Sequence, residues 1–380
     1  MKTLLVLLGV LAFTLPGLAD ELEARKGHLV IVGGGLQADN EPVYRAVLDR
    51  IPEDGTLGVL PTASGVPEES GPGHVQDFQQ YAGPNQKIVL LDIRNGDIDK
   101  ANDPEWVEKI RKCDGLWFTG GDQSRIVATF RPDEGDTPAY DAMWDVLNRG
   151  GVIGGTSAGA AMMSDPMIKW GNSHEALLLG VVNDVPDFGV GVGKGMGFLP
   201  DMLVDQHFFE RGRLGRLLVA MTHASVMRGI GVGENTAHIV DFAKRRTSVI
   251  GSNGVLAVGC EDVVHLKDGT LLPAAFYGHF ATNGYVMDSE AGEDLSAFGR
   301  VPDIAFIEAA MEGKPRSYEG PLAVSIDLKP NDRTRDDVGR YVIHGFHEND
   351  SNHEHWLQLR QAAQAALDAE RQEIAETQNP

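Results

Sequence analysis

Residues 152–160, VIGGTSAGA, join an apolar run to a Gly-x-Ser-x-Gly turn, and a run of small residues follows. Strand, tight turn and helix in this order are the setting of a nucleophile elbow, which exposes a serine at the carboxyl end of a strand. Gly155 and Gly159 permit the sharp bend because they carry no Cβ. The stretch therefore predicts Ser157 as a nucleophile, with the N–H of Ala158 facing an oxyanion. The alternative is an ordinary Gly/Ser turn.

The chain before the elbow alternates apolar strand-like runs with helical segments. We expect strands at 28–32, 57–60, 88–91 and 115–118, and helices at 41–50, 103–112 and 136–150. This alternation predicts an α/β fold with a mostly parallel sheet flanked by helices. Sites in such sheets form beyond the carboxyl ends of the strands, where three glycine-containing strand ends, 33–35, 120–121 and 154–155, are expected to converge.

The second half has a looser pattern. Residues 181–196 read as a loop, and short strands at 237–240, 248–250, 254–258 and 263–266 are expected as antiparallel additions to the sheet edge, with a hairpin at 252–254. A helix near 304–312, a strand at 341–343 and a last helix at 355–376 follow. That helix either docks on the domain or pairs with a second copy in a homodimer. The predicted units are a catalytic domain, 20–280, and a C-terminal extension, 281–380.

The first 19 residues have the features of a signal peptide. Lys2 precedes an apolar run at 4–13, and small residues lead to Ala19. The run is too short to span a bilayer, and the alternative is a buried N-terminal strand. We expect export with cleavage after Ala19, and so a secreted or periplasmic protein. Cys113 and Cys260 are either bridged there or two free thiols.

The charge and two weak motifs exclude several classes of partner. A formal net charge of −22 argues against nucleic acid and favours a cationic substrate. The run GGGLQA at 33–38 matches a loose dinucleotide fingerprint, but the strand at 57–60 ends without the acidic residue that would hold a ribose. A histidine-rich stretch, 344–355, fits no metal-site spacing that we trust. We expect neither cofactor nor metal.

A nucleophilic serine needs a base and an orienting acid. His207 is the best of the 12 histidines because it lies between Asp205-Gln206 and an arginine-rich helix start; the alternative is a surface histidine. Glu234 ends an apolar strand, from which a carboxylate would reach the carboxyl edge of the sheet. Glu175 stays open as the acid because it would give the chain order Ser–acid–His.

Three arginines follow the histidine closely: Arg211, Arg213 and Arg216. Arg213 and Arg216 share a helix face at a spacing of three. Guanidiniums concentrated in an acidic protein favour bidentate capture of carboxylates. The alternative is a solvated face that pairs with local acids.

Together these motifs resemble the cyanophycinase family of serine peptidases, relatives of the aspartyl dipeptidase peptidase E. Beside the three arginines, the matching segments are VIVGGG 30–35, PTAS 61–64, FTGGDQ 118–123, GTSAGA 155–160, DQHF 205–208 and GEN 233–235. The resemblance implies a three-layer α/β fold, flavodoxin-like or class I glutamine amidotransferase-like. It also implies hydrolysis of cyanophycin, a poly-aspartate with arginine on each side chain, to β-Asp-Arg dipeptides.

The resemblance carries roles onto matching residues. Ser157 is implied as nucleophile, His207 as base and Glu234 as acid, with Glu175 in reserve. The implied oxyanion donors are the N–H groups of Gly121 and Ala158, and the implied substrate pocket comprises Gln123, Asp205, Gln206, Arg211, Arg213 and Arg216.

The chain departs from the family pattern in its signal peptide, which looks like the extracellular branch of the family, and in the extension after about residue 280. The alternatives are an aspartyl dipeptidase or other serine hydrolase, and a secreted binding protein without catalysis.

Overall fold

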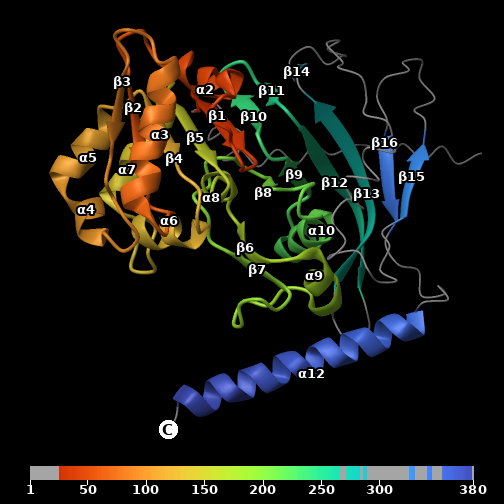
Figure 1. The fold of residues 1–380 in the computed structure, drawn as a ribbon. Coiled ribbons are helices and arrows are strands. Elements are labelled where there is room, and N and C mark those ends of the chain that lie inside the picture. Colours follow the sequence, from red (N-terminus) through yellow and green to blue (C-terminus); the bar gives the residue numbers. More distant parts are fainter. Residues whose placement is uncertain are drawn as a thin grey trace, which may run out of the picture.

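The computed structural model describes residues 25–265, 271–282, 286–288, 325–329, 340–344 and 353–378. Two large sheets dominate it (Figure 1). The first has eight strands in the order β14-β11-β10-β1-β5-β4-β2-β3. Their bounds are β1 His28–Val32, β2 Thr56–Leu60, β3 Lys87–Leu90, β4 Gly115–Phe118, β5 Val152–Thr156, β10 Thr236–Asp241, β11 Arg246–Gly251 and β14 Val286–Asp288.

Five neighbouring strands of this sheet, β1, β5, β4, β2 and β3, run parallel. Helices cover both faces of the sheet. The central strands have apolar side chains on both faces, since successive residues point to opposite sides, and each face is buried by its own set of helices. Leu29 and Ile31 pack with the helices after β3 and β4, whereas Val30 and Val32 pack with α2 and α3. The predicted three-layer α/β class is confirmed.

The helices around the first sheet are α2 Glu41–Leu48, α3 Pro67–Tyr81, α4 Ile98–Asn102, α5 Pro104–Arg111, α6 Gln123–Phe130, α7 Pro138–Asn148 and α8 Ala158–Ala161. Two begin as expected: the Asp103 side chain accepts the Glu105 N–H, and the Thr137 side chain accepts the Tyr140 N–H. Helices α3 and α6 had not been expected. The first turns of α3 contain Pro72 between two glycines, which hides the helical pattern.

The second sheet has six strands in the order β15-β16-β13-β12-β9-β8. Their bounds are β8 Leu203–Asp205, β9 Arg228–Val232, β12 Gly254–His265, β13 Leu271–Thr282, β15 Ser325–Lys329 and β16 Arg340–His344. Strands β15 and β16, from the predicted C-terminal extension, thus continue a sheet begun before it.

This sheet corrects two expectations. The strands expected at 254–258 and 263–266 are one strand, β12, which pairs with β9 and β13 rather than with the edge of the first sheet. As expected, β10 adds antiparallel to β1 and β11 adds antiparallel to β10. No hairpin forms at 252–254 between β11 and β12. The Ser252 N–H donates to the Asn235 carbonyl and the Asn253 N–H to Thr236 Oγ1, and these bonds turn the chain from one sheet into the other.

The stretch expected as a loop, 181–196, contains β7 Val190–Gly193, which pairs with β6 Met167–Gly171. Helix α10 Leu214–Ala224 packs on the second sheet, and α9 Ser173–Leu179 packs on α10 and β7. The last helix, α12 His353–Gln378, lies along α9 (Figure 1). Its Leu367 packs on Val182 and Val185, and Arg371 pairs with Asp184 at 2.7 Å.

The signal peptide and the helix expected at 304–312 lie outside the described residues. Within the described part, no helix has the length and apolar character that crossing a membrane requires.

Candidate active site

Ser157 lies directly after β5, on a strained turn. Its φ of 55° and ψ of −109° are a conformation that costs a non-glycine residue about 1–3 kcal/mol. The turn is closely packed, since a Cβ on Gly155 would lie 2.4 Å from the Gly159 carbonyl oxygen. Helix α8 begins at the next residue. The predicted strand–turn–helix elbow is therefore present.

His207 and Glu234 follow two neighbouring parallel strands of the second sheet. Strands β8 and β9 pair with Asp205 opposite Gly231, so the residues just beyond their carboxyl ends meet at one edge. His207 itself has a φ of 47°. This left-handed conformation turns its ring back toward the first sheet.

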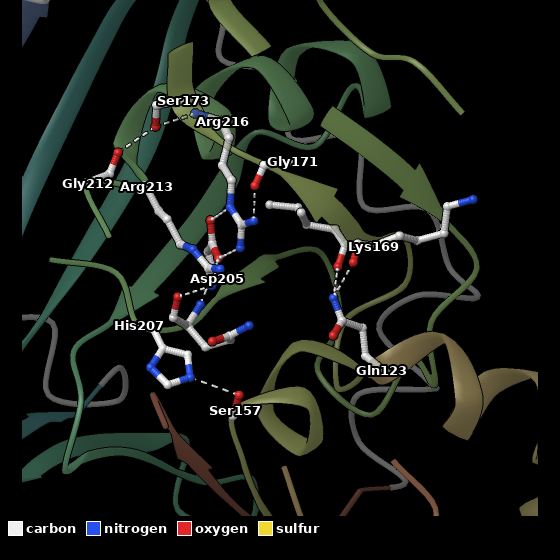
Figure 2. Close-up of polar contacts among 12 residues, drawn as sticks. Gln123, Ser157, Lys169, Gly171, Ser173, Asp205, His207, Gly212, Arg213 and Arg216 are labelled. Carbon is white, nitrogen blue, oxygen red and sulfur yellow. Dashed lines mark hydrogen bonds and ion pairs between the residues drawn. The ribbon is translucent and has the colours of Figure 1, made fainter. Parts of the chain in front are cut away.

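The three side chains form a continuous hydrogen-bonded relay. Ser157 Oγ lies 2.9 Å from His207 Nε2 (Figure 2), and His207 Nδ1 lies 2.6 Å from Glu234 Oε1. With the Nδ1–H donated to the carboxylate, Nε2 can accept the serine proton. The acid on the imidazole is Glu234. Glu175 lies in the first turn of α9, where its N–H donates to the Asn172 side chain.

The surroundings of His207 favour its neutral form. Burial lowers the pKa of His207, the hydrogen bond to Glu234 opposes this shift, and the cations Arg211 and Arg213 add to it. The ring therefore stays unprotonated to a pH below its ordinary pKa of 6.5. A histidine held neutral beside a serine hydroxyl can act as a general base.

The glycine run after β1 lets the two sheets approach. A Cβ on Gly33 would lie 2.1 Å from the Gly233 carbonyl oxygen, and one on Gly34 would lie 2.2 Å from His207 Cε1. A Cβ on Gly35 would come within 2.9 Å of Glu234 Oε2. The space beside Gly34 and Gly35 is thus filled by the side chains of His207 and Glu234.

Two of the three arginines of the cluster are enclosed. Arg216 is buried and donates to both oxygens of Asp205, which is 1% exposed, and to the Gly171 carbonyl (Figure 2). Arg213 is also buried and donates to the Gln206 carbonyl, with Nη1 3.6 Å from Asp205 Oδ1. Arg216 and Asp205 thus form a buried ion pair rather than an open surface, and only Arg211 is exposed.

The other predicted pocket residues are also enclosed. Gln123 Nε2 donates to the carbonyls of Ile168 and Lys169 at 2.7 Å each, which ties α6 to β6 (Figure 2). Gln206 is buried, and its Oε1 has no hydrogen-bond partner in the described part of the chain.

The predicted oxyanion donors adjoin the elbow. Gly121 follows Gly120, on which a Cβ would lie 3.5 Å from Ser157 Cβ, and Ala158 is the first residue of α8.

Glu210 was not singled out from the sequence. It lies three residues after His207, and its Oε1 accepts the Glu234 N–H at 3.0 Å. One acid among 55 acidic residues carries no signal of its own, although its closeness to the Asp-Gln-His segment was visible.

Within the described ranges, no group of three or more His, Cys, Asp or Glu residues could hold a metal ion. His344, His353 and His355 belong to β16 and α12, and His347 lies outside the described residues. Cys113 is a buried free thiol.

No protein-family model matches the chain. It is 32% identical over 244 residues to a protein of Synechococcus elongatus named cyanophycinase, covering 63% of this chain and 70% of that protein. It is 30% identical over 251 residues to a cyanophycinase of Geminocystis herdmanii, covering 64% of this chain and 85% of that one. A solved structure of a peptidase from an acI-B1 actinobacterium aligns with a TM-score of 0.47 at 21% identity, over 70% of this chain and 98% of that chain.

The fold and the two cyanophycinases define the class of the protein, a peptidase with an α/β architecture. The two relatives just named are matched over more than two thirds of their length. The chain belongs to the cyanophycinase family, and the resemblance drawn from its motifs is confirmed.

Proposed function

We propose that the protein is a serine-type peptidase that hydrolyses cyanophycin to β-Asp-Arg dipeptides. The observation that carries the proposal is the relay from Ser157 through His207 to Glu234, with separations of 2.9 and 2.6 Å. A hydrogen-bonded serine, base and orienting acid are the arrangement of acyl-transfer hydrolases. The substrate is supported by the relatives named cyanophycinase, and the net charge of −22 suits an arginine-rich polymer.

In this mechanism His207 Nε2 takes the proton of Ser157 as Oγ attacks an aspartyl carbonyl. Glu234 holds the ring in the tautomer with Nδ1 protonated and stabilises the imidazolium that forms. The imidazolium then protonates the leaving amine. Water, deprotonated by the same ring, attacks the acyl-serine, and the imidazolium returns that proton to Oγ as the bond between Oγ and the acyl carbon breaks and the carboxylate product leaves. The oxyanion of each step would be held by the N–H groups of Ala158 and Gly121.

Substrate carboxylates would be attracted to this group of arginines, because it carries more positive charge than the neighbouring carboxylate can balance. Arg213 and Arg216 share one buried carboxylate, Asp205. Burial and the neighbouring Arg216 lower the pKa of Arg213, so an additional negative charge there would be favourable. Exposed Arg211 adds to the same field. Asp205 and Arg216 would not contact the substrate; their ion pair would stabilise the segments that line the pocket.

The protein is also proposed to be exported, with residues 1–19 as signal peptide. Lys2 and the apolar run at 4–13 support this proposal. Protein collected from the medium or the periplasm should have an N-terminal sequence that begins at Asp20. A mature chain that begins at Met1 would end this part of the proposal.

The decisive experiment is incubation of the full chain with purified cyanophycin, followed by mass analysis of the soluble products. The wild type should release β-Asp-Arg dipeptides, and Ser157→Ala should release them at a rate at least about 10³-fold lower. Thermal unfolding of both proteins controls for the fold. Turnover of Asp-X dipeptides in preference to the polymer would favour an aspartyl dipeptidase, and full activity of Ser157→Ala would refute the mechanism.

A further inference from the structure

Glu210 joins the segment that carries His207 to the segment that carries Glu234. It is half-buried in the loop between β8 and α10. Its Oε1 accepts the backbone N–H of Glu234 at 3.0 Å and Asn253 Nδ2 at 2.5 Å. One carboxylate oxygen therefore connects the loop of Glu210 to two other segments, those of Glu234 and Asn253, at the edge of the candidate active site.

The other oxygen of Glu210 has no such role. Oε2 is buried and lacks a hydrogen-bond partner within the described ranges. Burial raises the pKa of Glu210, and the nearby charge of Glu234 adds to the shift. A buried polar atom without a partner lowers stability, so Oε2 does not explain why an acid is present at position 210. The hydrogen bonds that Oε1 accepts do explain it.

The contact lies at the point that aims the catalytic acid. The Glu234 N–H belongs to the peptide bond just before the Cα that carries the side chain, so fixing it restrains the backbone position from which that carboxylate extends to His207. The next residue, Asn235, has a φ of 53° and donates its N–H to the Gly34 carbonyl. Asn253 is itself fixed, because its own N–H donates to Thr236 Oγ1 at 2.7 Å.

We propose that Glu210 is a positioning residue, which holds the Glu234 carboxylate against His207 Nδ1 by accepting the Glu234 amide. The inference rests on the proposed serine mechanism. Glu210 does not touch the reacting atoms. Small displacements of a catalytic group lower the rate strongly, and loss of this bond should lower kcat about tenfold while KM, set by the substrate pocket, changes less than about twofold.

The test compares three substitutions in the full chain on cyanophycin. Glu210→Ala removes the acceptor, and Glu210→Asp withdraws it by one methylene; both should lower kcat about tenfold. Glu210→Gln keeps an acceptor oxygen and should restore kcat to within about twofold of the wild type. Glu105→Ala, an exposed acid on α5, controls for loss of a carboxylate elsewhere. If Glu210→Ala fails to fold, Glu210→Asp and Glu210→Gln still decide the question.

A second readout needs no substrate. The His207 Nδ1–H that is donated to Glu234 should give a downfield proton resonance, present in the wild type and in Glu210→Gln, and shifted or broadened in Glu210→Ala and Glu210→Asp. Wild-type kcat and an unchanged resonance in Glu210→Asp would overturn the proposal, and so would a Glu210→Gln enzyme as slow as Glu210→Asp. An inactive wild type or an active Ser157→Ala would instead refute the proposed function, while the resonance would still report on Glu210.

Discussion

Replacing Arg216 with alanine should destabilise the protein far more than it weakens substrate binding. The guanidinium is 3% exposed and donates three hydrogen bonds, two to Asp205 and one to the Gly171 carbonyl. Its loss leaves the Asp205 carboxylate, 1% exposed, with the Gln206 N–H at 2.8 Å and Arg213 at 3.6 Å. Removing one partner of a buried pair costs about 3–5 kcal/mol. At roughly 2–4 °C per kcal/mol, Tm should fall by roughly 6–20 °C.

The assay is urea unfolding, followed by tryptophan fluorescence, beside cyanophycin turnover measured below the transition. Arg111→Ala is the matched control, because it breaks an exposed pair with Asp145 and should cost less than about 1 kcal/mol. In an Asp205→Ala background, the further loss of Arg216 should cost much less than it does alone, because no buried carboxylate is then left without its partner. An Arg216→Ala protein of unchanged stability with a raised KM would refute this reasoning and return the guanidinium to the substrate.

Two further predictions concern the relay. Glu234→Gln should lower kcat by about 10³- to 10⁴-fold, because an amide no longer fixes the His207 tautomer, whereas Glu175→Gln should stay within about twofold; equal losses in both would contradict the assignment of the acid. The acidic limb of kcat/KM should have its midpoint below pH 6.5, since the pKa of His207 is lowered. Arg211→Ala removes one cation that lowers this pKa, so the limb should move to higher pH, while Arg211→Lys should leave it in place.

The parallel half of the fold and the relay could be predicted because their signals are local. The runs at 28–32 and 115–118 are apolar, which predicts buried strands. Asp103 and Thr137 are residues that favour a helix start, and α5 and α7 begin directly after them. Ser157 lies in a turn motif and Glu234 follows a strand that the sequence marks, whereas β8, the short strand before His207, had not been expected. The register of β8 on β9, which brings the base and the acid together, cannot be read from either strand alone.

What could not be predicted depends on pairing across long separations. Whether Arg216 faces solvent or an internal carboxylate could not be predicted, because its spacing of three residues from Arg213 fits both. The structure shows that Arg216 pairs with the buried carboxylate of Asp205. The second sheet was missed because β12 shows the same short alternating runs as the strands at the edge of the first. Which sheet a strand joins is set by its neighbours in space.

The Ser157 hydroxyl belongs to the eight-stranded sheet, while the imidazole and its carboxylate come from the six-stranded one. In the proposed mechanism the reaction therefore takes place where the two sheets meet, and a small displacement of one half against the other would stop it with both halves still folded. Loops on the six-stranded half could change to suit another polymer without disturbing the nucleophile, provided that the glycines at the end of β1 keep the two sheets close together.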